Sequence, residues 1–343
     1  MKDILTPRER FGMLVIDERP DRCPVIPLIT SHAATIAGIK LKKYYTNGEK
    51  MAKAQIIALE LYQHDAISIF SEVGIIAEAM GSEFQYPDND LPILKKPALV
   101  NPLVDKIVIP NPKKSARLPV YLEAIKYAYK AIGDIVPILA YIPAPFTTAM
   151  HLLPPERFLI DILKKPEEIK TLLDVVLEVT IKFCFEVINA GALPIIVDPL
   201  ASGSVISPAV YKEIALIYEK RLVDYLHRFD FDVILHICGD TSPYIETIPQ
   251  TNADLISLDR VNMLKAMEKL AHKMRLIGNF DTSALLFSTP EEIYKTASLM
   301  VEQLKSARKG YIIATGCEVP IKAPRENVSA LIKAGKEKGW YWV

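Results

Sequence analysis

Short apolar runs alternate with amphipathic stretches along most of the chain, which is the pattern of a parallel α/β sheet. Eight apolar runs have the length of a strand, and a helix or a helix-sized segment follows each of them. Buried parallel strands read as continuous apolar runs, whereas their connecting helices repeat apolar residues every three or four positions. The predicted strands are 25–29, 66–70, 137–142, 194–197, 233–237, 255–258, 276–277 and 311–314. Eight strand–helix units predict an α/β fold of the (β/α)₈ TIM-barrel type.

The helices between these strands have recognisable starts and stops. The clearest spans 166–190, where Pro166 opens an apolar stripe and Gly191 ends it. An open doubly wound sheet is the alternative, but no Gly-x-Gly-x-x-Gly or Gly-Lys-Ser/Thr phosphate loop follows any predicted strand, so the closed barrel is favoured. Further helices are predicted over 50–63, 119–132, 208–227, 290–307 and 324–338.

Two segments fall outside this repeating pattern. Residues 1–22 are expected to form an N-terminal helical extension, with a helix over 3–18 that is entered through the capping sequence Thr6-Pro7-Arg8-Glu9. Residues 81–118 contain six prolines and no sustained apolar period, so we expect an irregular insertion after the second strand. The whole chain, 1–343, is then a single barrel domain.

Composition and charge narrow the possible functions. The chain carries 41 basic and 41 acidic side chains, and this balance does not favour a nucleic-acid or anionic membrane partner. The first ten residues are charged and lack the apolar run of a signal peptide, and no apolar stretch is long enough to span a bilayer. Four cysteines without the spacing of a small disulfide scaffold indicate a reducing compartment. We therefore expect a soluble, cytoplasmic protein.

Candidate metal ligands lie where two of the predicted strands end, and the carboxyl ends of barrel strands form the active site. His236 and Cys238 are two positions apart and can point the same way, and Cys317 follows the eighth strand. One imidazole and two thiolates with an open fourth position are a catalytic ligand set for Zn²⁺. The cysteines could instead be buried small hydrophobic residues, but their glycine neighbours favour exposed turns. Asp259 could be a fourth ligand, a hydrogen-bond partner of His236 or a helix cap.

The other two cysteines are expected to be structural, because Cys184 lies on the apolar stripe of a helix and Cys23 precedes a proline at a strand start. A thiol in the open position of such a zinc would be deprotonated, and the sulfur-rich site would keep it nucleophilic. This chemistry favours alkylation of a thiol over hydrolysis.

The remaining strand ends supply candidate substrate-binding residues. They are Glu72, Thr147, Asp198, Ser202, Asn279 and Asp281.

The motifs at these strand ends resemble those of the uroporphyrinogen decarboxylase superfamily. The His-x-Cys…Cys pattern is similar to that of its zinc-dependent methylcobalamin:coenzyme M methyltransferases. Tetrapyrrole decarboxylases carry an arginine-rich segment after the first strand, whereas 28–34 contains no arginine. The resemblance runs through His236-Ile237-Cys238-Gly239, Gly278-Asn279-Phe280-Asp281, Gly316-Cys317, Pro324-Arg325-Glu326-Asn327, Ala144-Pro145-Phe146-Thr147 and the segments 75–81 and 198–208.

This resemblance implies a corrinoid-dependent methyltransferase. It would use Zn²⁺ to move a methyl group from methylcobalamin, held on a small corrinoid protein, to a small thiol substrate such as coenzyme M. His236, Cys238 and Cys317 would be both the metal ligands and the catalytic residues. The sulfonate of coenzyme M would need a cationic or hydrogen-bonding partner, which no motif marks.

Three alternatives stay open at this point. The first is a methyltransferase that demethylates a methoxy, methylamine or thioether substrate and loads a corrinoid protein. The second is a uroporphyrinogen decarboxylase-like enzyme. The third is a metal-binding barrel without enzymatic activity.

Overall fold

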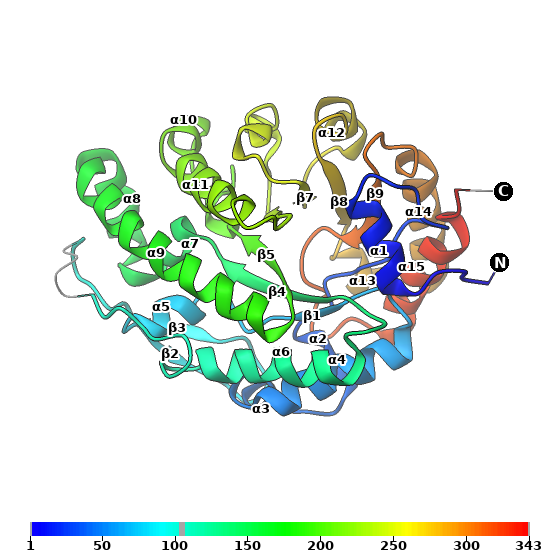
Figure 1. The fold of residues 1–343 in the computed structure, drawn as a ribbon, viewed down its shortest axis with the longest axis horizontal. Helices are drawn as coiled ribbons and strands as arrows, with labels where there is room; N and C mark the ends of the chain where they lie inside the picture. The colour runs from blue at the N-terminus through cyan, green and yellow to red at the C-terminus, as the bar shows by residue number, and fades with distance from the viewer. Residues whose placement is uncertain (1, 103–106, 342–343) are drawn as a thin grey trace.

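A computed structural model of the chain describes residues 2–102 and 107–341. Its centre is a seven-stranded parallel sheet that curls into a barrel, with the helices outside it (Figure 1). The strand order is β1-β4-β5-β6-β7-β8-β9, so neighbours in the sheet follow one another along the chain. These are the predicted second to eighth strands, and the TIM-barrel class is confirmed. The strands are β1 (Ile67–Ile69), β4 (Ile138–Pro143), β5 (Leu193–Val197), β6 (Ile234–Ile237), β7 (Leu255–Leu258), β8 (Arg275–Phe280) and β9 (Tyr311–Thr315).

The predicted first strand, 25–29, is not a regular strand, and this prediction is wrong. Pro24 and Pro27 have no backbone N–H and interrupt the hydrogen-bond ladder. The segment nevertheless fills the eighth position of the barrel, between β9 and β1. It is held there by Ile26 N to Ile313 O (2.7 Å), Val319 N to Leu28 O (3.0 Å) and Asp65 N to Val25 O (2.8 Å).

Helices cover the outside of the barrel. Helix α9 (Pro166–Ala190) has the bounds that the sequence predicts. The two shorter helices before it, α7 (Pro145–Leu152) and α8 (Pro155–Lys164), were not expected. Within the described residues, none of the helices combines the length and apolar character that a membrane crossing requires. The α-helices are α1 (Pro7–Val15), α2 (His32–Ile36), α3 (Leu41–Thr46), α4 (Gly48–Tyr62), α5 (Ile75–Ala79), α6 (Leu118–Ile132), α7 (Pro145–Leu152), α8 (Pro155–Lys164), α9 (Pro166–Ala190), α10 (Pro208–Val210), α11 (Leu216–His227), α12 (Met263–Leu270), α13 (Ala284–Phe287), α14 (Pro290–Leu304) and α15 (Arg325–Lys338).

Helix α1 (Pro7–Val15) closes the amino-terminal end of the barrel. It is shorter than the predicted 3–18, but its capping box is present, because Thr6 and Glu9 each accept the other's backbone amide. Phe11 and Leu14 pack into the interior cluster of side chains that the strands contribute on alternate positions. That cluster also contains Ile26, Leu28, Leu139, Tyr141, Ile195, Val197, Ile234, Leu255, Ile277 and Ile312.

The segment 81–118 is more regular than the sequence suggests. Strands β2 (Glu83–Gln85) and β3 (Ile93–Lys96) form an antiparallel hairpin, with an irregular register between Glu83 and Phe84. The expectation of an irregular insertion did not include this hairpin, because its two strands are too short and too exposed to produce an apolar alternation. Residues 103–106 of this insertion lie outside the described residues.

Buried ion pairs lie at the amino-terminal end of the barrel. Arg10 and Arg22 are both fully buried, and Asp65 binds both guanidinium groups, at 2.7 and 2.6 Å. Asp21 accepts two further hydrogen bonds from Arg10, and Asp3 accepts two from Arg22. Buried charges are tolerated when they are paired in this way.

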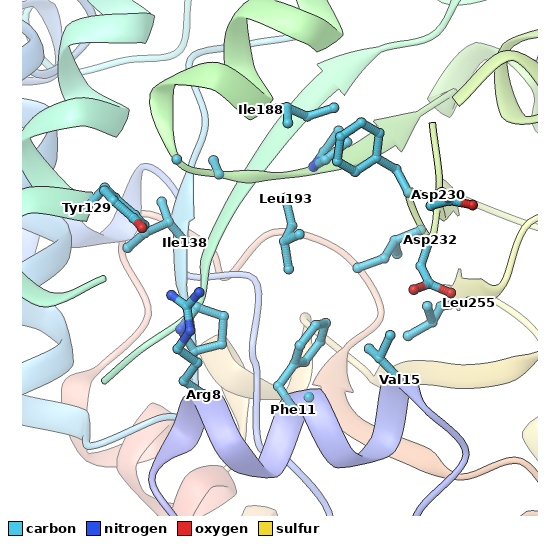
Figure 2. Close-up of a pocket in the computed structure, with 17 residues that line it drawn as sticks. Arg8, Phe11, Val15, Tyr129, Ile138, Ile188, Leu193, Asp230, Asp232 and Leu255 are labelled. Atoms are coloured by element: carbon cyan, nitrogen blue, oxygen red, sulfur yellow. The ribbon is translucent and has the colours of Figure 1, made fainter. Parts of the chain in front are cut away.

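A pocket of about 440 Å³ opens beside α1 at this same end (Figure 2). Its walls come from α1, from the starts of β4 and β5 and from the turn before β6. The lining is mainly apolar, so this end of the barrel is built for packing. The labelled lining residues are Arg8, Phe11, Val15, Tyr129, Ile138, Ile188, Leu193, Asp230, Asp232 and Leu255.

Candidate metal centre

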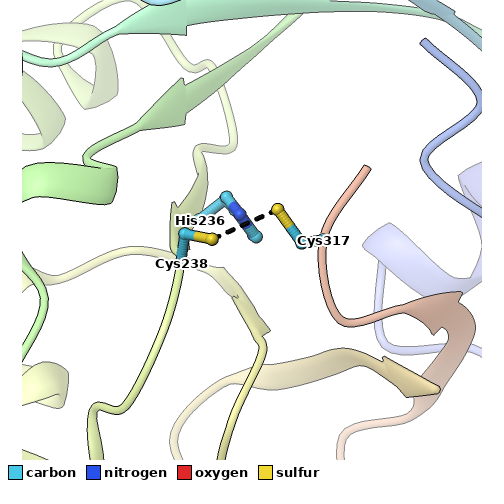
Figure 3. A group of neighbouring side chains, drawn as sticks. All are labelled: His236, Cys238 and Cys317. Carbon is cyan, nitrogen blue, oxygen red and sulfur yellow. Dashed lines mark hydrogen bonds between the residues drawn. The ribbon is translucent and has the colours of Figure 1, made fainter. Parts of the chain in front are cut away.

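The opposite, carboxyl-terminal end of the barrel brings His236, Cys238 and Cys317 together (Figure 3). One ligand atom from each of the three side chains lies within 4.8 Å of the others, and the two Sγ atoms are 3.1 Å apart. His236 lies near the carboxyl end of β6, Cys238 follows that strand directly, and Cys317 follows β9. Two strands that are not neighbours in the sheet therefore supply one compact group of ligand atoms.

The group fits a tetrahedral metal such as Zn²⁺. Zn–S bonds of about 2.3 Å at a tetrahedral angle separate two sulfurs by about 3.8 Å, so the thiols need to move apart only slightly. Cys238 and Cys317 both line an open pocket of about 830 Å³. A fourth ligand can therefore reach a metal ion that these residues hold.

Ser257 orients the imidazole. It lies opposite His236 in the parallel register between β6 and β7, and its Oγ is 2.9 Å from His236 Nδ1. With Nδ1 engaged, Nε2 is the ring nitrogen available to a metal. The sequence offered Asp259 as one candidate for this hydrogen bond, but the structure gives the position to Ser257.

Asp259 holds the turn that carries Cys238. Its Oδ2 accepts the amide of Gly239 at 2.8 Å and lies 3.5 Å from Cys238 Sγ. It does not cap the next helix, because Asn262 is the N-cap of α12. A Cβ at Gly316 would lie 2.5 Å from Asp259 Oδ1, so only glycine fits beside the second cysteine.

The neighbouring thiol and burial both disfavour the thiolate form of Cys317. The contact with Cys238 raises the pKa of the Cys317 thiol, and burial raises it further, whereas His236 lowers it. Because the thiolate is the metal ligand, a metal ion that binds here must displace the proton of Cys317.

Two of the predicted substrate-binding residues, Asn279 and Asp281, line the cysteine pocket. The side-chain amide of Asn279 donates to the carbonyls of Asp259 (2.6 Å) and Val261 (2.9 Å). Asp281 accepts the amide of Ser283 at 2.8 Å. Asn279 therefore stiffens the turn 259–261, and the second carboxylate oxygen of Asp281 is left for other partners.

The other four candidates, Glu72, Thr147, Asp198 and Ser202, are not among the described residues that line this pocket. Glu72 forms an ion pair with Arg117 at 2.6 Å, and burial raises the pKa of its carboxyl. Ser202 lies beside the Cys238 turn, where its Oγ would meet a Cβ placed at the neighbouring glycine.

Thr147 and Asp198 belong to a buried network that the sequence did not indicate. Thr147 donates its amide (3.0 Å) and its hydroxyl (2.5 Å) to one oxygen of Asp198, and Tyr211 donates to Glu219 at 2.8 Å. Both carboxyls are fully buried, and burial raises the pKa of Asp198 to about 7 and that of Glu219 well above its usual range. Asp198 Oδ2 and Glu219 Oε1 have no hydrogen-bond partner among the described residues, and a proton held between the two carboxyls would connect the end of β5 to α11.

Sequence reasoning assigned no role to three residues near the candidate metal centre. Ser257 lies on β7, two positions before Asp259, so the two side chains are expected to point the same way. This spacing is only a weak signal that Ser257 belongs to the site. Arg260 follows Asp259 directly and lines the cysteine pocket. Glu318 follows Cys317, accepts the hydroxyl of Thr30, and has a carboxyl whose pKa is raised by burial.

Comparison with known proteins identifies relatives over nearly the full length of this chain. A methylated-thiol–coenzyme M methyltransferase of Methanosarcina mazei is 27% identical over 97% of this chain and 90% of its own. A methylcobamide:CoM methyltransferase MtbA of Methanosarcina acetivorans is 24% identical over 96% of this chain and 98% of its own. A solved methyltransferase structure from Methanosarcina mazei superposes with a TM-score of 0.89 at 25% identity, covering 97% of this chain and 99% of that chain.

Family assignment rests on a match that spans almost the whole barrel. Residues 6–338 match the family described as uroporphyrinogen decarboxylase (URO-D), which confirms the superfamily that the strand-end motifs resemble. The chain belongs to the uroporphyrinogen decarboxylase family.

Proposed function

We propose that the protein is a zinc-dependent methyltransferase that moves a methyl group from a methyl-corrinoid to a thiol. The observation that carries the proposal is the convergence of His236, Cys238 and Cys317 within 4.8 Å beside an open pocket. The names of the relatives supply donor and acceptor, since they include a methylcobamide:CoM methyltransferase. Coenzyme M is therefore the first acceptor to test.

The chain's own residues prepare the acceptor sulfur. Zinc held by His236, Cys238 and Cys317 would keep the acceptor thiol deprotonated at neutral pH. Ser257 fixes the imidazole, and Asp259 fixes the Cys238 turn, so the ligands keep their positions while the thiol enters. The acceptor sulfur would then attack the methyl carbon in line, and the electron pair of the broken carbon–cobalt bond would stay on the corrinoid.

We further propose how the methyl donor is held and where the protein acts. The donor is carried by a small corrinoid protein that presents its cobalt face to the carboxyl end of one barrel domain formed by the whole chain. All four cysteines are free, which suits a reducing cytoplasm. Among the candidate substrate-binding residues, Asn279 and Asp281 act at the cysteine pocket. Glu72, Thr147, Asp198 and Ser202 support the barrel mouth around it.

A tetrapyrrole decarboxylase activity is disfavoured by the segment after the first barrel position. Segment 28–34 contains no arginine, and its polar side chains are engaged within the protein. Thr30 donates to Glu318, Ser31 bonds Tyr45, and His32 bonds Tyr62. No cation of this segment is available to carboxylates of a substrate.

The test is metal analysis of purified, reduced protein, followed by spectroscopic measurement of methylcobalamin demethylation with and without coenzyme M. We expect about one zinc per chain and demethylation that requires the thiol. Zinc without demethylation by any thiol would contradict the direction of transfer and favour loading of a corrinoid from a methylated substrate. Absence of zinc from active protein would contradict the metal site.

A further inference from the structure

The cysteine pocket carries one cation. Arg260 is the only lysine or arginine among the described residues that line it, whereas Asp240, Asp259 and Asp281 line it with negative charge. The Arg260 side chain is exposed and makes no ion pair or hydrogen bond with the described part of the chain. Its guanidinium is thus free to bind a ligand in the pocket.

The backbone that carries Arg260 is fixed relative to the metal centre. The amide of Arg260 donates to the carbonyl of Gly239 at 3.0 Å, and Gly239 directly follows the ligand Cys238. On either side of Arg260, the carbonyls of Asp259 and Val261 accept the two hydrogen bonds from Asn279. A flexible cationic side chain therefore projects from a rigid turn beside a cysteine ligand.

We propose that Arg260 binds the anionic tail of the acceptor thiol, a sulfonate or a carboxylate, while the sulfur occupies the metal centre. This assignment rests on the proposed function. A guanidinium offers two parallel N–H donors that match the oxygens of either anion. Arg260 thereby sets the substrate class of the site as small anionic thiols.

The acidic groups around Arg260 sharpen this specificity. Asp240 and Asp281 each bind a backbone amide with one oxygen, at 2.9 and 2.8 Å, and keep the second oxygen for other partners. They repel an anionic tail everywhere except at the guanidinium. They would also accept an ammonium group that lies next to the anion, as in an α-amino acid thiol.

The experiment compares acceptor thiols on the zinc-loaded protein. 2-Mercaptoethanesulfonate and 3-mercaptopropionate test the two anions, homocysteine tests an anion with an adjacent ammonium, and 2-mercaptoethanol and cysteamine carry no anion. We expect a lower KM for the anionic thiols, and we expect Arg260→Gln to reduce the preference for anionic over neutral thiols about 10- to 100-fold. Arg260→Lys should retain part of it. Arg308→Gln, an exposed arginine outside the pocket lining, is the matched control and should retain all of it.

Calorimetric binding of the same thiols to wild type and Arg260→Gln gives a second readout that does not depend on methyl transfer. Equal affinity for anionic and neutral thiols, or an unchanged preference in Arg260→Gln, would overturn the assignment of Arg260 while the methyltransferase proposal stands. Tail-dependent binding that Arg260→Gln weakens, with no demethylation by any thiol, would support Arg260 and overturn the proposed function. A higher affinity for homocysteine than for either simple anion would identify the amino acid thiol as the source of the anion.

Discussion

The two ends of the barrel use charged and reactive groups in opposite ways. At the amino-terminal end, Arg10, Arg22 and Asp65 are buried, and each is satisfied by a partner of opposite charge. At the carboxyl-terminal end, Cys238 and Cys317 face each other and an open pocket. Groups whose partners come from the protein hold the fold together, whereas groups left facing a pocket are available to a ligand.

The four cysteines show the same contrast. Cys23 and Cys184 are fully buried, and burial raises the pKa of Cys23 to about 12, so both thiols stay protonated and inert. Cys238 and Cys317 are partly exposed and share one site with an imidazole. Exposure and neighbours, rather than residue type, separate structural cysteines from candidate metal ligands.

Removal of one cysteine at the carboxyl-terminal end should have the largest effect. Cys238→Ala and Cys317→Ala each delete one of three protein ligands, so we expect bound zinc to fall toward zero and thiol-dependent demethylation to be lost. Metal analysis and circular dichroism of the purified variants measure zinc content and folding. Cys184→Ala is the control and should keep its zinc. A Cys317→Ala variant with full zinc content would refute the site.

Removal of one carboxylate at the amino-terminal end should affect stability instead. Asp65→Asn leaves the buried Arg10 and Arg22 without their shared counter-ion, so we expect a loss of about 3–5 kcal/mol in the free energy of unfolding. Urea unfolding measures it, and zinc content below the transition should be unchanged. Asp88→Asn breaks the exposed pair with Lys40, which solvent screens, and should change the free energy of unfolding far less than Asp65→Asn does. Equal costs for the two variants would remove the distinction between the buried network and a surface pair.

Local periodicity explains how much of this fold the sequence predicts. The strands and α9 follow from apolar spacing and from Pro and Gly signals that act within a few residues. The strand prediction for 25–29 is wrong because the apolar pattern of this segment resembles a strand, whereas Pro24 and Pro27 have no amide N–H to donate to a neighbouring strand. The hairpin β2–β3 was missed because two short, exposed strands produce no apolar alternation.

The metal centre could be predicted only in part, for a related reason. His236 and Cys238 share a face by strand alternation, and Cys317 follows because strand ends converge in a barrel. The bond from Ser257 to His236 depends on the register between two strands, and the Asp198–Glu219 pair joins a strand to a helix. A single sequence contains no information on such contacts.

Loss of the hydrogen bond from Ser257 should weaken the metal centre without removing a ligand. Ser257→Ala frees His236 Nδ1, so we expect zinc affinity to fall about 10- to 100-fold. Competition with a chromophoric chelator measures this affinity. Ser298→Ala is the matched control, because this largely buried hydroxyl in α14 has no hydrogen-bond partner among the described residues. Unchanged affinity in Ser257→Ala would show that the imidazole is oriented by packing alone.

The smallest expected effect is a pH dependence that originates at the amino-terminal end. Burial alone raises the pKa of Asp21, but hydrogen bonds from Arg10 and from the amides of Ile4 and Leu5 lower it from its ordinary 3.8 to about 2. The folded state therefore gains about 1–2 kcal/mol above pH 4, after allowance for solvent screening, and this contribution is lost as the pH falls from about 4 to 2. Urea unfolding of wild type and Asp21→Asn between pH 5 and 2 measures it. The variant should be less stable at pH 5 and should lose less stability on acidification, because the substituted amide does not titrate; parallel curves would assign the acid sensitivity to other carboxyls.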